Sequence, residues 1–157
     1  MKMPNMVVTT IAAIVIISVL GYYARDNARN GGRVGNNDIG LELGVPIEHK
    51  LTDYKTTPLP VVLRLVNNTA DTMPLTADGP CKIFRYFVTT TEGGFVQAAR
   101  APEICEETQT RAAIAEQDVI EEIRQVPLDS NRYQPGKYVL RVKFWNYEGT
   151  ASFTLTE

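Results

Sequence analysis

Two cysteines are the residues of this chain with the most definite chemistry. Cys81 and Cys105 are its only cysteines, and no metal-ligand neighbours accompany them. An even pair of this kind indicates one disulfide, which requires an oxidising compartment. The chain after Cys81 runs through an aromatic segment, turns at Gly93 and Gly94 and returns, so the two sulfur atoms can approach within bonding range. The alternative is two separate buried thiols in a reduced domain.

The other reactive residue types lack a catalytic arrangement. His49 is the only histidine, and the three serines, at positions 18, 130 and 152, do not lie in a Gly-x-Ser-x-Gly elbow. We expect His49, between Glu48 and Lys50, to be solvated. The acidic residues between positions 106 and 122 lack the glycine-punctuated spacing of a calcium loop and indicate a solvated acidic face. The sequence therefore predicts a protein that is not an enzyme and has no cofactor, metal or small-molecule substrate.

One loop and one short motif are candidates for binding and modification. The segment 98–110 carries Arg100, Pro102 and Glu103 and would be held by Cys105. A loop restrained in this way loses less entropy on binding than a free one, so we expect it to form a binding loop. Positions 67–69, Asn-Asn-Thr, match an N-glycosylation acceptor. Because these residues have a turn composition, we interpret that match as chance.

The N-terminal region has the composition of a membrane anchor. Residues 6–24 form an uncharged, mostly aliphatic run of nineteen, and a helix of that length nearly crosses a hydrocarbon core of about 30 Å. Tyr22 and Tyr23 suit the interface between lipid and water. We therefore expect residues 1–24 to be a transmembrane anchor in contact with membrane lipid. Lys2 before the run also fits a cleaved secretory signal, but the residues near the end of the run suit cleavage poorly.

Charge and cysteine content disagree about the side of the membrane on which the rest of the chain lies. Arg25, Arg29 and Arg33 outnumber Lys2, which favours a cytoplasmic C-terminal part. The predicted disulfide favours the opposite side, and we expect a periplasmic or extracellular domain because the charge difference is small. Residues 25–40 are rich in Asn, Gly and charge and are predicted to form a flexible tether. The net charge of −2 lacks the excess of positive charge that is typical of nucleic-acid-binding proteins.

Residues 41–157 have the pattern of one all-β domain. Short apolar segments at 59–67, 82–90, 138–144 and 151–156 are separated by turn residues, including a predicted hairpin at 92–94. Tyr138, Leu140, Val142 and Phe144 alternate with polar or smaller residues, as in a half-buried strand. The segment 110–126 is ambiguous, because its apolar residues have helical spacing while its context favours a strand. We expect a strand or a mixture there.

Three features together resemble a known family. They are an aliphatic segment ending in Asn-x-Thr at 61–69, a Gly followed by a Phe-rich segment and a Gly turn at 79–94, and Pro-Gly-x-Tyr at 135–138. Their order resembles the intracellular proteinase inhibitor (BsuPI-type) domain. The resemblance covers about 100 residues and implies an immunoglobulin-like antiparallel β-sandwich. The cysteine pair, the 98–110 loop and the anchor depart from that family, so inhibition is implied only weakly.

Two functions follow from these observations. The first is a non-catalytic accessory or structural subunit of a larger bacterial membrane complex, with other membrane-protein subunits as its partners. A respiratory or photosynthetic complex is a reasonable host. The second is a membrane-tethered proteinase inhibitor or ligand-binding module that acts through the loops of the sandwich.

Overall fold

The structure is a computed structural model that describes residues 34–100, 102 and 104–157. The predicted anchor with Tyr22 and Tyr23, the first part of the predicted tether and Glu103 lie outside these residues. In the described part of the chain, no helix has the length and apolar character needed to cross a membrane.

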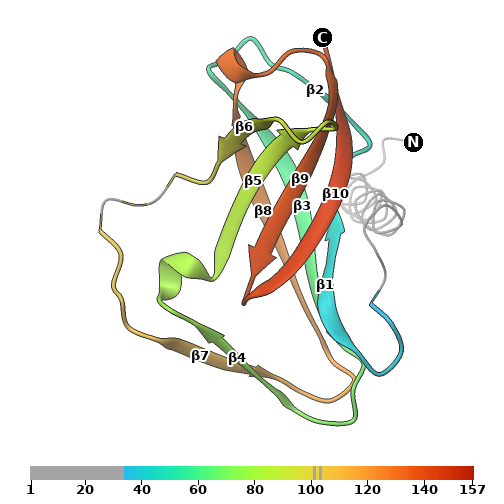
Figure 1. The fold of residues 1–157 in the computed structure, drawn as a ribbon, viewed down its shortest axis with the longest axis vertical. Helices are drawn as coiled ribbons and strands as arrows, with labels where there is room; N and C mark the ends of the chain where they lie inside the picture. Colours follow the sequence, from blue (N-terminus) through green and yellow to red (C-terminus); the bar gives the residue numbers. More distant parts are fainter. Residues whose placement is uncertain (1–33, 101, 103) are drawn as a thin grey trace, which may run out of the picture.

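Two sheets face each other as a β-sandwich (Figure 1). The three-stranded sheet has the order β1 (Ile39–Gly44), β3 (Thr56–Asn67) and β8 (Val119–Asp129). The five-stranded sheet has the order β2 (Glu48–Lys50), β10 (Tyr147–Thr156), β9 (Gly136–Phe144), β5 (Phe84–Thr90) and β6 (Phe95–Ala98). All pairs are antiparallel except β2 with β10. The predicted all-β sandwich is therefore confirmed.

A separate two-stranded arm extends from one end of the sandwich (Figure 1). It consists of β4 (Met73–Ala77) and β7 (Thr110–Ile114), and the short 3-10 helix η1 (Pro80–Lys82) connects it to β5. Leu75, Ala77 and Ile114 are buried, and Leu75 and Ile114 belong to the same hydrophobic core as the buried residues of the sandwich. Asn146 Nδ2, in the β9–β10 turn, donates to Thr76 O at 2.8 Å and ties the arm to the five-stranded sheet.

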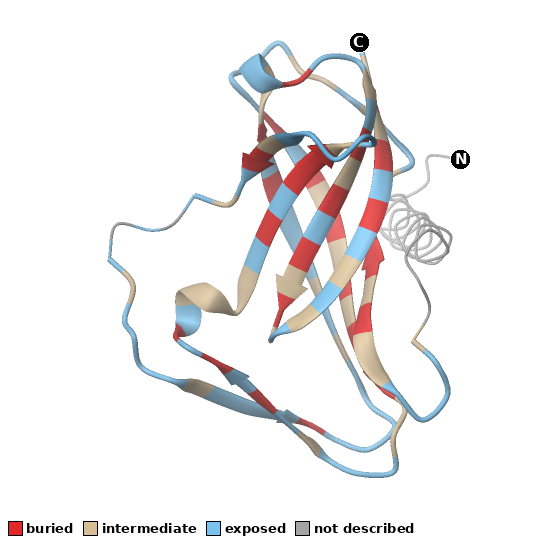
Figure 2. Cartoon of the chain, in the orientation of Figure 1, coloured by how far each residue is buried: buried red, intermediate tan, exposed pale blue. Residues whose placement is uncertain are grey.

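The core follows the alternation that the sequence predicted. Tyr138, Leu140, Val142 and Phe144 of β9 are all buried, and the residues between them are less buried. Figure 2 shows the same alternation along β5. Because successive side chains of a strand point to opposite faces, one set of each strand fills the space between the sheets.

The ambiguous segment 110–126 is made of strands. It forms β7 and the first part of β8, separated by a turn in which Gln117 has a φ of 53°. Strand β8 pairs along its whole length with β3, from Thr56 opposite Asp129 to Val66 opposite Val119. Backbone pairing with β3 and burial of Val126 and Leu128 outweigh the helical propensity of the segment.

The connectivity has the features of an immunoglobulin-like sandwich. Strands β3 and β8 pair in one layer and β5, β9 and β10 in the other, which is the B–E and C–F–G arrangement of that fold. The loop between β8 and β9 contains the 3-10 helix η2 (Ser130–Arg132). Just after it, the Tyr138 hydroxyl donates to Gln134 O at 2.8 Å, which is the hydrogen bond of a tyrosine corner.

The ordered domain begins earlier than the predicted boundary at residue 41. Ile39 and Gly40 pair with Asn67 and Val66 in β1, and Asn68 N donates to Asp38 O at 2.9 Å. The predicted tether therefore extends too far, because its last residues complete a strand that pairs with β3.

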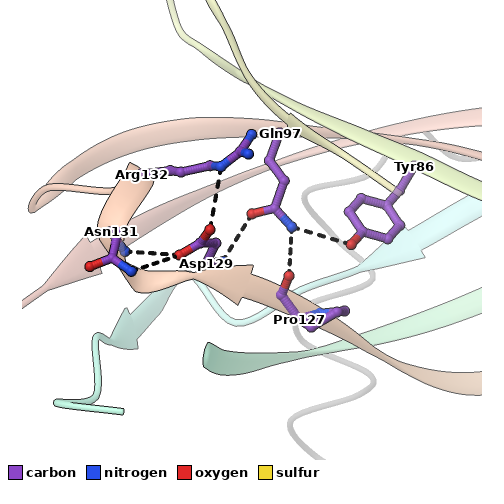
Figure 3. A network of polar contacts seen from close by, with 6 residues as sticks. All are labelled: Tyr86, Gln97, Pro127, Asp129, Asn131 and Arg132. Atoms are coloured by element: carbon purple, nitrogen blue, oxygen red, sulfur yellow. Dashed lines mark hydrogen bonds and ion pairs between the residues drawn. The ribbon is translucent and has the colours of Figure 1, made fainter. Parts of the chain in front are cut away.

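A buried glutamine joins the open side edges of the two sheets (Figure 3). Gln97 of β6 donates from Nε2 to Pro127 O at 2.6 Å, and its Oε1 accepts from Asp129 N at 3.0 Å. Nε2 also lies 3.4 Å from the hydroxyl of Tyr86, which belongs to β5. Since Pro127 and Asp129 belong to β8, this side chain links β6 to the opposite layer.

Candidate binding surfaces

The predicted disulfide is confirmed. Cys81 in η1 is bonded to Cys105, with a Cα–Cα distance of 6.0 Å. The bond connects the start of β5 to the long segment between β6 and β7. No free cysteine is present in the described residues.

The disulfide holds the candidate binding loop at one point. Arg100 and Pro102 are exposed, and the side chain of Ile104 beside the disulfide is 88% exposed. A Cβ on Gly79, whose φ is 137°, would lie 2.5 Å from Glu106 O, so the loop passes closely over this glycine. The loop is thus held at residues 105–106 and presents an apolar side chain next to its anchor point.

Two predictions about polar residues have different outcomes. His49 was expected to be solvated, but it is half-buried in β2 and its Nε2 is buried without a hydrogen-bond partner among the described residues. His49 lies opposite Leu155 in the parallel pairing of β2 with β10, a tertiary contact that its charged sequence neighbours did not indicate. Asn67 of the Asn-Asn-Thr motif is fully buried and donates from Nδ2 to Ala115 O at 2.8 Å and Asp71 O at 2.9 Å. That side chain is a structural bridge, which agrees with our interpretation of the motif as chance.

Metal-binding chemistry is not assembled in the described residues. Across 34–100, 102 and 104–157, no group of three or more His, Cys, Asp or Glu side chains is placed to hold a metal ion.

A hollow on the outer face of the five-stranded sheet is the second candidate surface. Its volume is about 380 Å³, and it lies over β5, β9 and the start of β10. Pairing of the strands sets two rows of side chains across it. Arg85 is opposite Lys143, which is opposite Glu148, and Phe87 is opposite Arg141, which is opposite Thr150.

The hollow has a positive electrostatic character. Arg85 and Lys143 lie directly opposite each other, and like charges in this position destabilise a sheet. Lys143 Nζ is 3.8 Å from Glu148 Oε1, whereas Arg85 and Arg141 form no ion pair with another described residue. A bound anion would relieve the repulsion, and a guanidinium can bind a carboxylate or phosphate through two parallel hydrogen bonds.

An exposed aromatic ring completes this surface. Phe87 is 40% exposed, and the guanidinium carbon of Arg141 lies 5.7 Å from its ring centroid. Such stacking holds a guanidinium in place while leaving its N–H groups free to donate. We call Arg85, Phe87, Arg141 and Lys143 the cationic face. It fits a partner that presents carboxylates or phosphates beside an apolar group.

Sequence reasoning missed the cationic face. Arg141 and Lys143 are among the polar residues that alternate with the apolar residues of the segment 138–144, but Arg85 lies more than fifty positions earlier in the chain. The pattern Arg-x-Phe at 85–87 and Arg-x-Lys at 141–143 was a usable signal. It required the knowledge that β5 and β9 are neighbours.

Comparison with known proteins found no matching family and no matching curated protein. Among solved structures, a CARDB domain from Pyrococcus furiosus is 10% identical, with a TM-score of 0.42, over 79% of this chain and 97% of that chain. A β-glucosidase from Listeria innocua is 11% identical, with a TM-score of 0.39, over 76% of this chain. A β-glucosidase from Erythrobacter marinus is 12% identical, with a TM-score of 0.39, over 75% of this chain. This chain spans 16% of the length of either glucosidase.

Proposed function

We propose that this chain is a non-catalytic accessory subunit of a larger bacterial membrane complex. In this proposal residues 1–24 anchor it in the lipid, and the immunoglobulin-like sandwich lies outside the cytoplasm against a neighbouring subunit. The cationic face is the observation that carries the proposal. It combines two guanidinium groups that form no ion pair among the described residues with an exposed aromatic ring on paired strands, which suits an acidic surface of a partner protein.

The physical basis is charge complementarity on a preformed surface. The side chains of the cationic face extend from paired strands, so few backbone degrees of freedom are lost when a partner binds. Arginine and aromatic residues are enriched among the residues that dominate binding energy at interfaces. Because exposed charges contribute, the association should weaken as the salt concentration rises.

Co-migration of the full chain with a large complex tests the proposal. The membrane is solubilised in a mild detergent, and the chain is followed by native electrophoresis. We expect it to run with a large assembly, and the double variant Arg85→Glu, Arg141→Glu to run as a small species. Arg111→Glu with Lys55→Glu is the matched control, since both residues are exposed and lie outside the hollow, and the two substitutions together give the same charge change. A wild-type chain that runs alone would refute the subunit proposal.

The alternative is a membrane-tethered proteinase inhibitor or ligand-binding module. The disulfide-held loop 98–110, with Ile104 exposed beside Cys105, favours it. In this case the full chain should inhibit a member of a protease panel with slow, tight kinetics, and Cys81→Ser with Cys105→Ser should weaken the inhibition. Arg85→Glu would leave it unchanged. Absence of inhibition by the wild-type chain across the panel would remove this alternative.

A further inference from the structure

Strand β8 is an open edge of the three-stranded sheet, because among the strands of the described residues it pairs only with β3. Its even-numbered residues direct their backbone groups to β3. At the two ends of the pairing, Asp118 O accepts from Asn67 N at 2.9 Å and Ser130 N donates to Lys55 O at 3.0 Å. Backbone groups of a strand alternate in direction, so the odd-numbered residues of β8 direct theirs away from β3.

Both ends of this open edge are already occupied. Gln97 covers Pro127 O and Asp129 N, as described above, and Val119 N donates to Asp118 Oδ1 at 2.8 Å. Proline has no N–H to donate, and Pro127 therefore suits an outward position on an edge strand. Glu121, Ile123 and Gln125 remain as the residues whose outward backbone groups have no strand partner in the described part of the chain.

The apolar character of this stretch is unusual for an edge strand. The side chain of Ile123 is 68% exposed, and that of Val119 is 38% exposed. An exposed edge with apolar side chains is a template for pairing with another strand. The free backbone groups and the exposed isoleucine lie at the same place on the molecule.

We propose that a second copy of this chain binds here, with the two β8 strands antiparallel and Ile123 opposite Ile123 of the second copy. The charges select this register. It places Glu122 opposite Arg124 of the second copy, and Arg124 opposite Glu122 of the second copy. If the two-fold axis passed through residue 122 or residue 124 instead of 123, Glu122 would lie opposite Glu122 of the second copy, or Arg124 opposite Arg124 of the second copy. Like charges directly opposite each other are unfavourable.

In the proposed dimer, the free backbone groups of each β8 edge pair with the β8 strand of the other copy. It adds about six backbone hydrogen bonds between the two strands, from Glu121, Ile123 and Gln125 of each copy. Arg124 is already held near this position, since its Nε donates to Glu122 Oε2 at 2.8 Å and its guanidinium carbon is 5.8 Å from the Phe84 ring centroid. The two pairs form a four-charge cluster when the strands meet, and the two isoleucine side chains cover each other. The two three-stranded sheets become one continuous sheet.

A cysteine placed on the two-fold axis tests the register. The two natural cysteines are bonded to each other, so Ile123→Cys introduces one free thiol. In a hydrogen-bonded antiparallel pair the Cα atoms lie about 5.5 Å apart, within reach of a disulfide. On oxidation in mild detergent the Ile123→Cys chain should form a covalent dimer, while Tyr54→Cys, at a residue that is 79% exposed and lies beyond the far end of the β3–β8 pairing, should stay monomeric. Equal cross-linking of the two variants would overturn the register.

Charge-reversal variants test whether Glu122 and Arg124 pair across the dimer. Self-association of the full chain in detergent is measured by sedimentation. Glu122→Arg alone and Arg124→Glu alone should each weaken self-association about tenfold, because two like-charge contacts replace two unlike ones. An equimolar mixture of the two variants should recover the wild-type dimer as a heterodimer, and the double variant should recover it as a homodimer. A monomeric wild-type chain, or a mixture that does not associate, would overturn the proposal. Arg85→Glu with Arg141→Glu should leave this dimer intact, which separates the result from that for the cationic face.

Discussion

The hydroxyl groups of two neighbouring tyrosines should have opposite effects on stability. Tyr138 and Tyr133 pack edge to face with ring centroids 5.2 Å apart, and both are buried. The Tyr138 hydroxyl donates to Gln134 O at 2.8 Å and lies 3.2 Å from Gln134 N, which donates to it. The Tyr133 hydroxyl is buried and has no partner among the described residues. Replacing either residue by phenylalanine removes the hydroxyl and keeps the ring.

Tyr138→Phe should lower the free energy of unfolding by about 1 to 2 kcal/mol, the value of one or two hydrogen bonds whose backbone partners can turn to water. The melting temperature should fall by about 4 to 8 °C in a domain of this size. Tyr133→Phe removes a polar group that is buried without a partner, so the free energy of unfolding should stay constant or rise by up to about 1 kcal/mol.

The difference in stability between the two variants should increase at alkaline pH. Burial raises the pKa of Tyr133 far above its usual value, and the nearby Tyr86 and Tyr138 raise it further. Burial also raises the pKa of Tyr86, against a smaller opposing effect of Gln97. A group with a raised folded-state pKa contributes its full stability below the unfolded pKa of about 10 and loses it as the pH rises through the folded value. Stability should therefore decline above about pH 10, and less steeply in Tyr133→Phe.

Thermal unfolding of the full chain followed by circular dichroism at pH 7 and pH 11 measures both effects. The wild-type chain, Tyr138→Phe and Tyr133→Phe are compared under the same detergent conditions. If Tyr133→Phe costs as much as Tyr138→Phe at pH 7, the hydroxyl of Tyr133 has a partner and the reasoning is refuted. An unchanged alkaline slope in Tyr133→Phe would refute the linkage argument.

Three further predictions concern stability and modification. Cys81→Ser with Cys105→Ser should lower the free energy of unfolding by about 3 kcal/mol in the chain-entropy model, measured by denaturant titration, and an unchanged midpoint would contradict it. Gln97→Ala should lower the free energy of unfolding by about 2 to 4 kcal/mol in the same titration, because it breaks the link between the sheets and leaves buried groups unpaired. Gln125→Ala, at an exposed residue, should leave the free energy of unfolding almost unchanged. Mass spectrometry after expression in a glycosylating host should find Asn67 unmodified, and Asn67→Asp should destabilise the domain by about 2 to 3 kcal/mol, since it replaces buried donors by a charge.

Period-two alternation made β9 and the last strand predictable. Tyr138, Leu140, Val142 and Phe144 are buried as expected because the direction of a side chain in a strand depends only on its own backbone. The hairpin after β5 was predicted for a similar reason, since Gly93 adopts a φ of 89° that glycine accepts without strain. These features need no information from distant segments.

The segment 110–126 was ambiguous because β8 has apolar residues on both faces. Ile120 and Val126 point to the inside of the sandwich, while Val119 and Ile123 lie on the outer face. Apolar positions distributed in this way imitate helical spacing. Only the pairing with β3, contributed by residues more than fifty positions away, identifies the segment as a strand.

The sequence by itself determined the all-β class, the strand alternation and the pairing of the two cysteines. Local backbone geometry and the parity of the cysteines decide these properties. The tertiary structure decided which strands are neighbours, and with that the cationic face, the partial burial of His49, the link made by Gln97 and the open edge of β8. Each of these depends on the register between segments far apart in the chain, which no local pattern encodes.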